Sequence, residues 1–186
     1  MTKKYNLGYC LNSDEIKVAA NILANDDLQF LNSIDLPTTN NVSMSAVSEI
    51  IIDGYFDANK ANPIFLPMVI TGHDVLLSLV PSKNGTITPY LNDSLGKIES
   101  GAKAIALKVT NLLKTLDDNI VDMIDLSIPQ QYANCCGLAV VSNIASINKA
   151  FHEGKTIDTS CLYQGENMEQ YYQNLGDNYV APFWPE

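Results

Sequence analysis

The stretch HDVLLSLVPSKNGTITPYLND, residues 73–93, decides the fold. Residues 75–80 form an apolar run of the length of a buried strand, and residues 86–91 are a second candidate strand. Between them lies a turn that contains Asn84-Gly85, a strong sequence signal for a β-hairpin. We therefore predict an antiparallel hairpin whose open end brings residues 73 and 93 side by side.

The chain before this hairpin reads as helices followed by a strand. Asn12 or Ser13 can cap a first helix, with Glu15 at the position of a capping box. A second helix is predicted over residues 44–52, and Gly54 ends it. Residues 64–70 read as a strand that Pro67 interrupts, which predicts an edge strand or a bulge.

After the hairpin, residues 95–116 have the apolar periodicity of an amphipathic helix, and residues 120–126 read as a short strand. An apolar helix over residues 136–151 is predicted to be the buried central helix, and residues 168–172 a last short one. The order predicts an α+β fold with a mostly antiparallel sheet packed on helices. We expect one domain over residues 1–186, with a helical region over 1–62 and a catalytic core over 63–151.

Composition narrows the classes of function. The chain has 186 residues, 46% of them hydrophobic and 17% charged, which is typical of a globular protein. Its net charge of −10 argues against nucleic acid and anionic membranes as partners, and favours a basic partner. Every basic residue apart from histidine is a lysine, so no guanidinium group can clamp a phosphate. We expect no Sec-type signal and no transmembrane segment.

The four cysteines lack zinc-binding spacing, and we expect reduced thiols, no metal and no cofactor. Cys136 opens an apolar helix, where the helix dipole stabilises a thiolate, although a buried core cysteine is the ordinary explanation. His73 at a strand end can act as a base, and Asp93 can orient its ring or simply cap the next helix. Gln130 can supply an oxyanion-hole amide.

Taken together, these residues resemble a family. Pro63-Ile64-Phe65-Leu66-Pro67 resembles the strand before the catalytic histidine of CE-clan ubiquitin-like proteases, and His73 leads into the next strand. Asp93-Ser94-Leu95 resembles the family's Asp-Ser-Leu element. The run of residues 130–137 (QQYANCCG) resembles its Gln-x5-Cys-Gly element.

The resemblance implies a papain-like fold with the nucleophile at the start of a buried helix. Catalytic roles then fall to Cys136 as nucleophile, His73 as base, Asp93 as orienter and Gln130 in the oxyanion hole. Two residues depart from the pattern. Asp74 stands where SUMO proteases usually carry Trp, and it competes with Asp93 for His73, although strand alternation favours Asp93. Cys135 stands where many members carry Asp, and it remains a second candidate nucleophile.

The activity that the resemblance implies is removal of ubiquitin or a ubiquitin-like modifier from conjugates by a monomeric thiol protease. Acidity favours ubiquitin over SUMO, because the contact face and tail of ubiquitin are basic. The alternatives are a Yop-type acetyltransferase and a non-catalytic binding module of the same fold. Short members of this kind resemble bacterial effectors, which implies secretion into the host cell cytoplasm and a role in virulence.

Overall fold

The predicted hairpin forms the middle of the sheet in the computed structural model, which describes residues 3–36, 44–96, 101–130, 132 and 134–184. Strands β4 (His73–Pro81) and β5 (Ile87–Asn92) pair antiparallel, with Leu76 opposite Asn92. Strand β3 (Ile64–Ile70) pairs antiparallel with the other edge of β4. These three strands carry most of the pairing, and they fix the positions of the residues that follow β5.

Three short strands extend this antiparallel centre with parallel pairings. Strands β1 (Gln29–Phe30) and β2 (Ile34–Leu36) both lie along β3, and β6 (Ile124–Asp125) lies along β5. The result is a mixed sheet with the order β1-β3-β4-β5-β6, and β2 pairs with β3 beyond β1. This sheet, packed with helices, confirms the predicted α+β class.

The position of Pro67 differs from the prediction of an edge or bulge. Strand β3 is an inner strand and runs through Pro67, which pairs with Leu76 of β4. On the other edge, β1 pairs up to Phe65 and β2 begins pairing at Met68. Pro67 therefore lies opposite the gap between two short strands, where a residue without an N–H group breaks no strand pairing.

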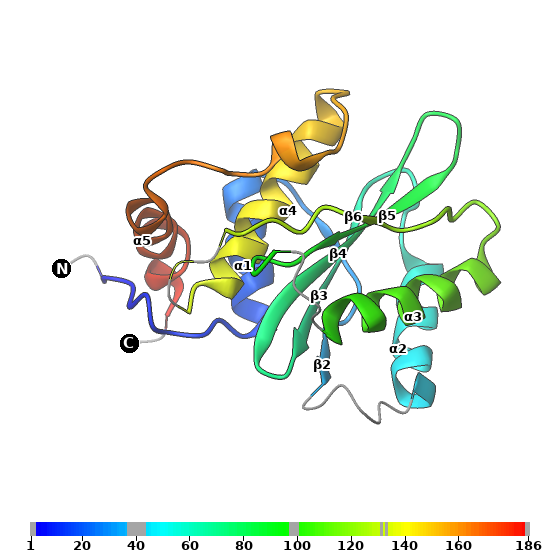
Figure 1. The fold of residues 1–186 in the computed structure, drawn as a ribbon, viewed down its shortest axis with the longest axis horizontal. Coiled ribbons are helices and arrows are strands. Elements are labelled where there is room, and N and C mark those ends of the chain that lie inside the picture. The colour runs from blue at the N-terminus through cyan, green and yellow to red at the C-terminus, as the bar shows by residue number, and fades with distance from the viewer. Residues whose placement is uncertain (1–2, 37–43, 97–100, 131, 133, 185–186) are drawn as a thin grey trace.

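Helices cover both faces of the sheet (Figure 1). One face carries α1 (Ser13–Ala24), α4 (Cys136–His152) and α5 (Met168–Tyr179). The other face carries α2 (Met44–Asp57) and α3 (Gly101–Leu116). Two short 3-10 helices, Thr159–Cys161 and Ala181–Phe183, complete the described elements. The molecule thus has a helical layer on each side of one mixed sheet.

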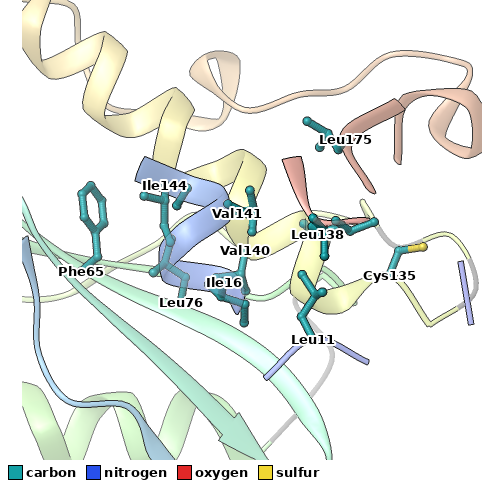
Figure 2. Close-up of a cluster of buried hydrophobic side chains, with 14 of the residues drawn as sticks. Leu11, Ile16, Phe65, Leu76, Cys135, Leu138, Val140, Val141, Ile144 and Leu175 are labelled. Atoms are coloured by element: carbon teal, nitrogen blue, oxygen red, sulfur yellow. The ribbon is translucent and has the colours of Figure 1, made fainter. Parts of the chain in front are cut away.

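Side chains of β4 alternate between two hydrophobic cores. Leu76 and Val80 pack in the core with α1 and α4, whereas Val75 and Leu77 pack in the core with α2 and α3. Figure 2 shows Leu76 in the first of these cores, beside Ile144 of α4. Even-numbered residues of β4 therefore face α4, and this parity decides where Asp74 points.

The start of α1 agrees with the prediction from the sequence, whereas the start of α3 does not. The capping box of α1 is present, because the Asn12 side chain accepts from Glu15 N and the Glu15 side chain accepts from Asn12 N. The helix predicted from residue 95 begins later, since Leu95 forms a β-bridge with Pro129 and α3 starts at Gly101. Residues 97–100 of that prediction lie outside the described residues.

Two predicted elements are shorter or less uniform than expected. The strand predicted over residues 120–126 is reduced to β6, with an isolated bridge between Ile120 and Ile87. The region over residues 1–62 contains the strands β1 and β2 as well as helices. Strands of two or three residues show no alternation that a sequence pattern could detect. No helix in the described ranges is long and apolar enough to cross a membrane.

Candidate active site

A tight turn places His73 at the first position of β4. Thr71 and Gly72 join β3 to β4, and both have positive φ, at 54° and 76°. Two successive positive φ values are those of a type I′ hairpin turn, which Gly adopts freely but a β-branched residue adopts with strain. This turn closes the β3–β4 hairpin and pairs His73 directly with Ile70. It leaves the imidazole at the open end of the other hairpin, β4–β5.

Asp93 meets His73 as the hairpin predicts. His73 Nε2 lies 2.8 Å from Asp93 Oδ1, and the two side chains are 16% and 2% exposed. A carboxylate accepts hydrogen bonds, so in the neutral imidazole Nε2 is the protonated nitrogen and Nδ1 is the free acceptor. The pair therefore leaves one ring nitrogen able to take a proton.

The loop after β5 holds Asp93 in place. Asp93 Oδ1 also accepts from the backbone N–H of Leu95, at 2.9 Å, and its own N–H donates to Ser127 Oγ, at 3.0 Å. The isolated bridge between Leu95 and Pro129 fixes the same loop against the segment that leads to α4. Asp93 thus connects the hairpin to the chain that carries the cysteines.

Cys136 is the first residue of α4 and is 4% exposed. Its thiol donates to Asp74 Oδ2 at an Sγ···Oδ2 distance of 3.2 Å. Asp74 is on an even-numbered position of β4, on the face that packs against α4, and is 5% exposed. Among the described residues, the hydrogen bond of this thiol goes to Asp74 and not to His73.

The electrostatics of this contact favour a neutral thiol. Burial, followed by the charge of Asp74, raises the pKa of the Cys136 thiol to about 12. Burial also raises the pKa of the Asp74 carboxyl, and the hydrogen bond from Cys136 and the charge of His73 oppose that rise. The thiol is therefore protonated at neutral pH in this conformation.

Cys135, the second candidate nucleophile, lies in a different environment. It is the N-cap residue of α4, 1% exposed, and its Sγ lies 3.6 Å from the carbonyl oxygen of Leu7. Burial raises the pKa of its thiol to about 11. The contact of its thiol is thus with the N-terminal segment, whereas Cys136 contacts Asp74. The geometry favours Cys136 over Cys135 as nucleophile, because Cys136 contacts Asp74 and Asp74 is the chain neighbour of His73.

The segment before α1 covers both cysteines. A Cβ atom added at Gly137 would lie 2.9 Å from Leu11 Cβ and 3.2 Å from Asp74 Oδ2, so the first turn of α4 is tightly packed. Figure 2 shows Leu11 and Cys135 close to the start of α4, with Leu138 in the same core. Only glycine fits after Cys136 in this arrangement.

Gln130 is buried, at 2% exposed, and its amide is fully engaged. Its Nε2 donates to Asn143 Oδ1 at 3.2 Å and to the carbonyl oxygen of Tyr163 at 2.9 Å, and its Oε1 accepts from Asn143 Nδ2 at 3.0 Å. The backbone carbonyl oxygen of Gln130 accepts from Tyr172 OH at 2.7 Å. An oxyanion-hole role would require at least one N–H bond of this amide to break. Gln131 lies outside the described residues.

The predicted site residues form two hydrogen-bonded pairs, His73 with Asp93 and Cys136 with Asp74. From the sequence, both Asp74 and Asp93 were candidate partners of His73. Direct contact favours Asp93, as strand alternation suggested, but the contact of Asp74 with the thiol was missed. The same alternation, followed to α4, would have indicated it. In the described ranges, no group of three or more His, Cys, Asp or Glu side chains is placed to hold a metal ion.

No family model matches the sequence, and no curated protein matches it. Solved structures do match. The effector protein RavZ of Legionella pneumophila superposes with a TM-score of 0.59 at 14% identity, over 93% of this chain and 64% of that chain. A de-sumoylating protease gives a TM-score of 0.53 at 11% identity, over 95% and 78% of the two chains.

A structure of AvrA with IP6 and CoA gives a TM-score of 0.51 at 12% identity, over 87% of this chain and 67% of that one. The chain thus spans less than two thirds of the RavZ chain that it matches. At these identities the matches establish the architecture, helices packed on a mixed sheet. The chain has the fold of the CE-clan cysteine proteases.

Proposed function

We propose that this chain is a cysteine protease that removes ubiquitin or a ubiquitin-like modifier from conjugates. The observation that carries the proposal is the His73–Asp93 pair at the open end of the hairpin, with Cys136 at the N-terminus of the buried helix in contact with Asp74, the chain neighbour of His73. A base with an orienting carboxylate and a thiol at a helix N-terminus are the parts of a nucleophilic site. The CE-clan fold supports this combination.

In the proposed reaction, His73 takes the proton of the Cys136 thiol through Nδ1, because Nε2 is bonded to Asp93. The sulfur then forms a bond to the carbonyl carbon of the last residue of the modifier. The C–N bond to the substrate amine breaks, and His73 returns the proton to that amine. Water hydrolyses the resulting thioester and restores the thiol.

Stabilisation of the oxyanion in this reaction falls to backbone N–H groups at the start of α4. The oxyanion-hole role predicted for Gln130 stays a prediction. It requires that Gln130 Nε2 give up a hydrogen bond to Asn143 or to Tyr163. A change of the Gln130 rotamer would have to free one N–H group and leave the Asn143 amide with a new partner.

The choice of modifier rests on charge. The net charge of −10 favours a basic partner, and the contact face and tail of ubiquitin are basic. We therefore propose ubiquitin ahead of SUMO, and a monomeric enzyme. The similarity to the Legionella effector RavZ supports, as a further part of the proposal, action inside a host cell after secretion.

A Yop-type acetyltransferase is the second candidate, because the structure of AvrA with IP6 and CoA shares this fold. Such an enzyme would need sites for the phosphates of IP6 and CoA. The chain has no arginine and 21 acidic residues against 11 lysines, a poor composition for binding phosphate clusters. A non-catalytic module is the third candidate, favoured by the protonated Cys136 thiol.

Covalent probes separate the three candidates. We expect ubiquitin with a C-terminal electrophile to label the full chain, the Cys135→Ala variant and the His152→Ala variant, and not Cys136→Ala. His152 is the matched control for His73, since it pairs with Asp26, at 3.3 Å, near the other end of α4. Autoacetylation from acetyl-CoA without any labelling would favour the acetyltransferase, and neither signal would favour the binding module.

A further inference from the structure

Asp74 is a buried carboxylate that accepts a hydrogen bond from a thiol. The Sγ of Cys136 lies 3.2 Å from Oδ2, and α4 approaches so closely that a Cβ at Gly137 would lie 3.2 Å from the same oxygen. No lysine is paired with Asp74 among the described ion pairs. Burying such a carboxylate costs free energy unless a hydrogen-bond donor or an opposite charge compensates it.

Other groups at the sulfur would favour a thiolate. The backbone N–H groups of Asp74 and Gly137 are directed at Cys136 Sγ, and they act to lower its pKa. The N-terminus of α4 adds the positive end of a helix dipole. The carboxylate of Asp74 and the burial of the site act in the opposite direction. The sulfur thus has the donors of a thiolate site and one carboxylate that opposes them.

Asp74 is unsuited to be the base that removes this proton. Burial, followed by the charge of Asp74 itself, raises the pKa of the Cys136 thiol to about 12. Transfer of the proton from this sulfur to a carboxylate would therefore be uphill. The carboxylate instead stabilises the neutral thiol, because it accepts a hydrogen bond from the thiol and repels a negatively charged sulfur.

We propose that Asp74 restrains Cys136 as a hydrogen-bonded, unreactive thiol, and that the site becomes active when this bond breaks and the thiol turns to His73. The consequence for catalysis rests on the proposed protease function. The state of the thiol does not, and it can be measured without any substrate. Asp74 is in this account a regulatory residue of the active centre.

The titratable groups around Asp74 come from three elements. His73 precedes it on β4, Asp35 acts on it from β2, and Cys136 faces it from α4. His73 favours the charged carboxylate, and Asp35 disfavours it. His73 is itself held by Asp93 through Nε2, so its close contact is with Asp93 and not with Asp74.

The test follows alkylation of Cys136 in the full chain by iodoacetamide as a function of pH, with the modified peptide quantified by mass spectrometry. Peptide mapping separates Cys136 from the exposed Cys10 and from Cys161, and a Cys135→Ala background in every variant removes the adjacent thiol that shares its peptide. In Asp74→Asn and Asp74→Leu we expect the labelling midpoint to fall by about one pH unit or more, and the rate at pH 8 to rise about tenfold. Asp122→Asn, at an exposed carboxylate paired with Lys114 away from this site, is the matched control and should leave the midpoint nearly unchanged.

Thermal unfolding of each variant accompanies the labelling. An unchanged or higher midpoint in a folded Asp74→Leu variant would overturn the proposal. Loss of the fold in both Asp74 variants would also overturn it, because Asp74 would then be a structural residue. Easier alkylation without labelling by ubiquitin or SUMO probes would support the restraint and contradict the protease. Probe labelling through Cys136 with an unchanged midpoint would support the protease and contradict the restraint.

Discussion

Asp74 and Asp93 lie at the same end of one hairpin, yet their surroundings give them different chemistry. Asp93 accepts from the imidazole of His73 and from the backbone of Leu95, so its charge is well satisfied. Asp74 accepts from a thiol in a buried position, and burial raises its pKa. A carboxylate of the first kind orients a base, and one of the second kind opposes a thiolate.

The orienting role of Asp93 is tested by Asp93→Asn. The amide keeps one oxygen for both Leu95 N–H and His73 Nε2–H, which share Oδ1, but it loses the negative charge that stabilises the imidazolium. If the proposed function holds, turnover should fall about 10²- to 10⁴-fold. Asp122→Asn, at an exposed carboxylate paired with Lys114, is the matched control. Comparable turnover in the two variants would remove Asp93 from the mechanism.

The raised pKa of the Cys136 thiol makes a prediction about stability. The thiol titrates near 8.5 in the unfolded chain and at about 12 in the folded chain. Its contribution is therefore complete below about pH 8.5 and is lost as pH rises toward the folded value. The free energy of unfolding should fall by at most about 1.4 kcal/mol per pH unit for this thiol between about pH 9 and 10.

Urea unfolding of the wild type and of Cys136→Ala at several pH values measures this slope. The alanine variant should show a shallower decline, and Cys135→Ala should behave similarly, because burial raises the pKa of its thiol to about 11. Parallel curves for the wild type and Cys136→Ala would show that the thiol titrates alike in both states, against the buried thiol described above.

At the scale of elements, the turn before β4 carries strain that the rest of the sheet maintains. Thr71 has a φ of 54°, a conformation that β-branched residues adopt rarely. Asn is the preferred residue before Gly in a type I′ turn. We expect Thr71→Asn to stabilise the fold by about 1 kcal/mol, measured by urea unfolding, with the position of His73 kept. Destabilisation would mean that the Thr71 side chain makes contacts worth more than the strain.

Local signals predicted the elements that depend on local sequence. Asn84-Gly85 predicted the hairpin, Asn12 and Glu15 the start of α1, and the apolar run after Cys136 the central helix. Each of these signals lies within a few residues of the structure that it specifies. The meeting of His73 and Asp93 followed from the hairpin, because both residues lie at its open end, beyond the last pair of Leu76 with Asn92.

Features that depend on distant segments were missed. The strands β1 and β2 exist because β3 offers them an edge, and their own sequences are too short to show a period. The bond between Asp74 and Cys136 joins residues 62 positions apart, and it depends on how α4 lies on the sheet. Gln130 was assigned by spacing alone, which could not reveal its bonds to Asn143 and Tyr163.

At the scale of the molecule, the two ends of the described chain meet near the start of α4 (Figure 1). The ring of Tyr5 stacks on Trp184 with centroids 5.5 Å apart, and Tyr5 N donates to Asp177 Oδ1 at 2.6 Å. The same N-terminal segment continues to Leu7 and Leu11, which lie against the cysteine turn. Access to Cys136 is therefore linked to the packing of both ends.

The net charge of −10 makes a prediction about the partner. Attraction between an acidic enzyme and a basic modifier speeds association at low salt and is screened as salt rises. We expect the rate of labelling by a ubiquitin probe to fall several-fold between about 20 and 200 mM NaCl. The rate with a small electrophile such as iodoacetamide is the control and should change little. Equal salt dependence for both reagents would argue against steering of a basic partner.

The proposed function is tested most directly by turnover. The measurement is release of a fluorophore from the C-terminal amide of ubiquitin by the full chain, with the matching SUMO conjugate in parallel. We predict release by the wild type and by Cys135→Ala, and none above background by Cys136→Ala or His73→Ala. Absence of release from both conjugates, or undiminished release by Cys136→Ala, would contradict the assignment of this site as a modifier protease with Cys136 as its nucleophile.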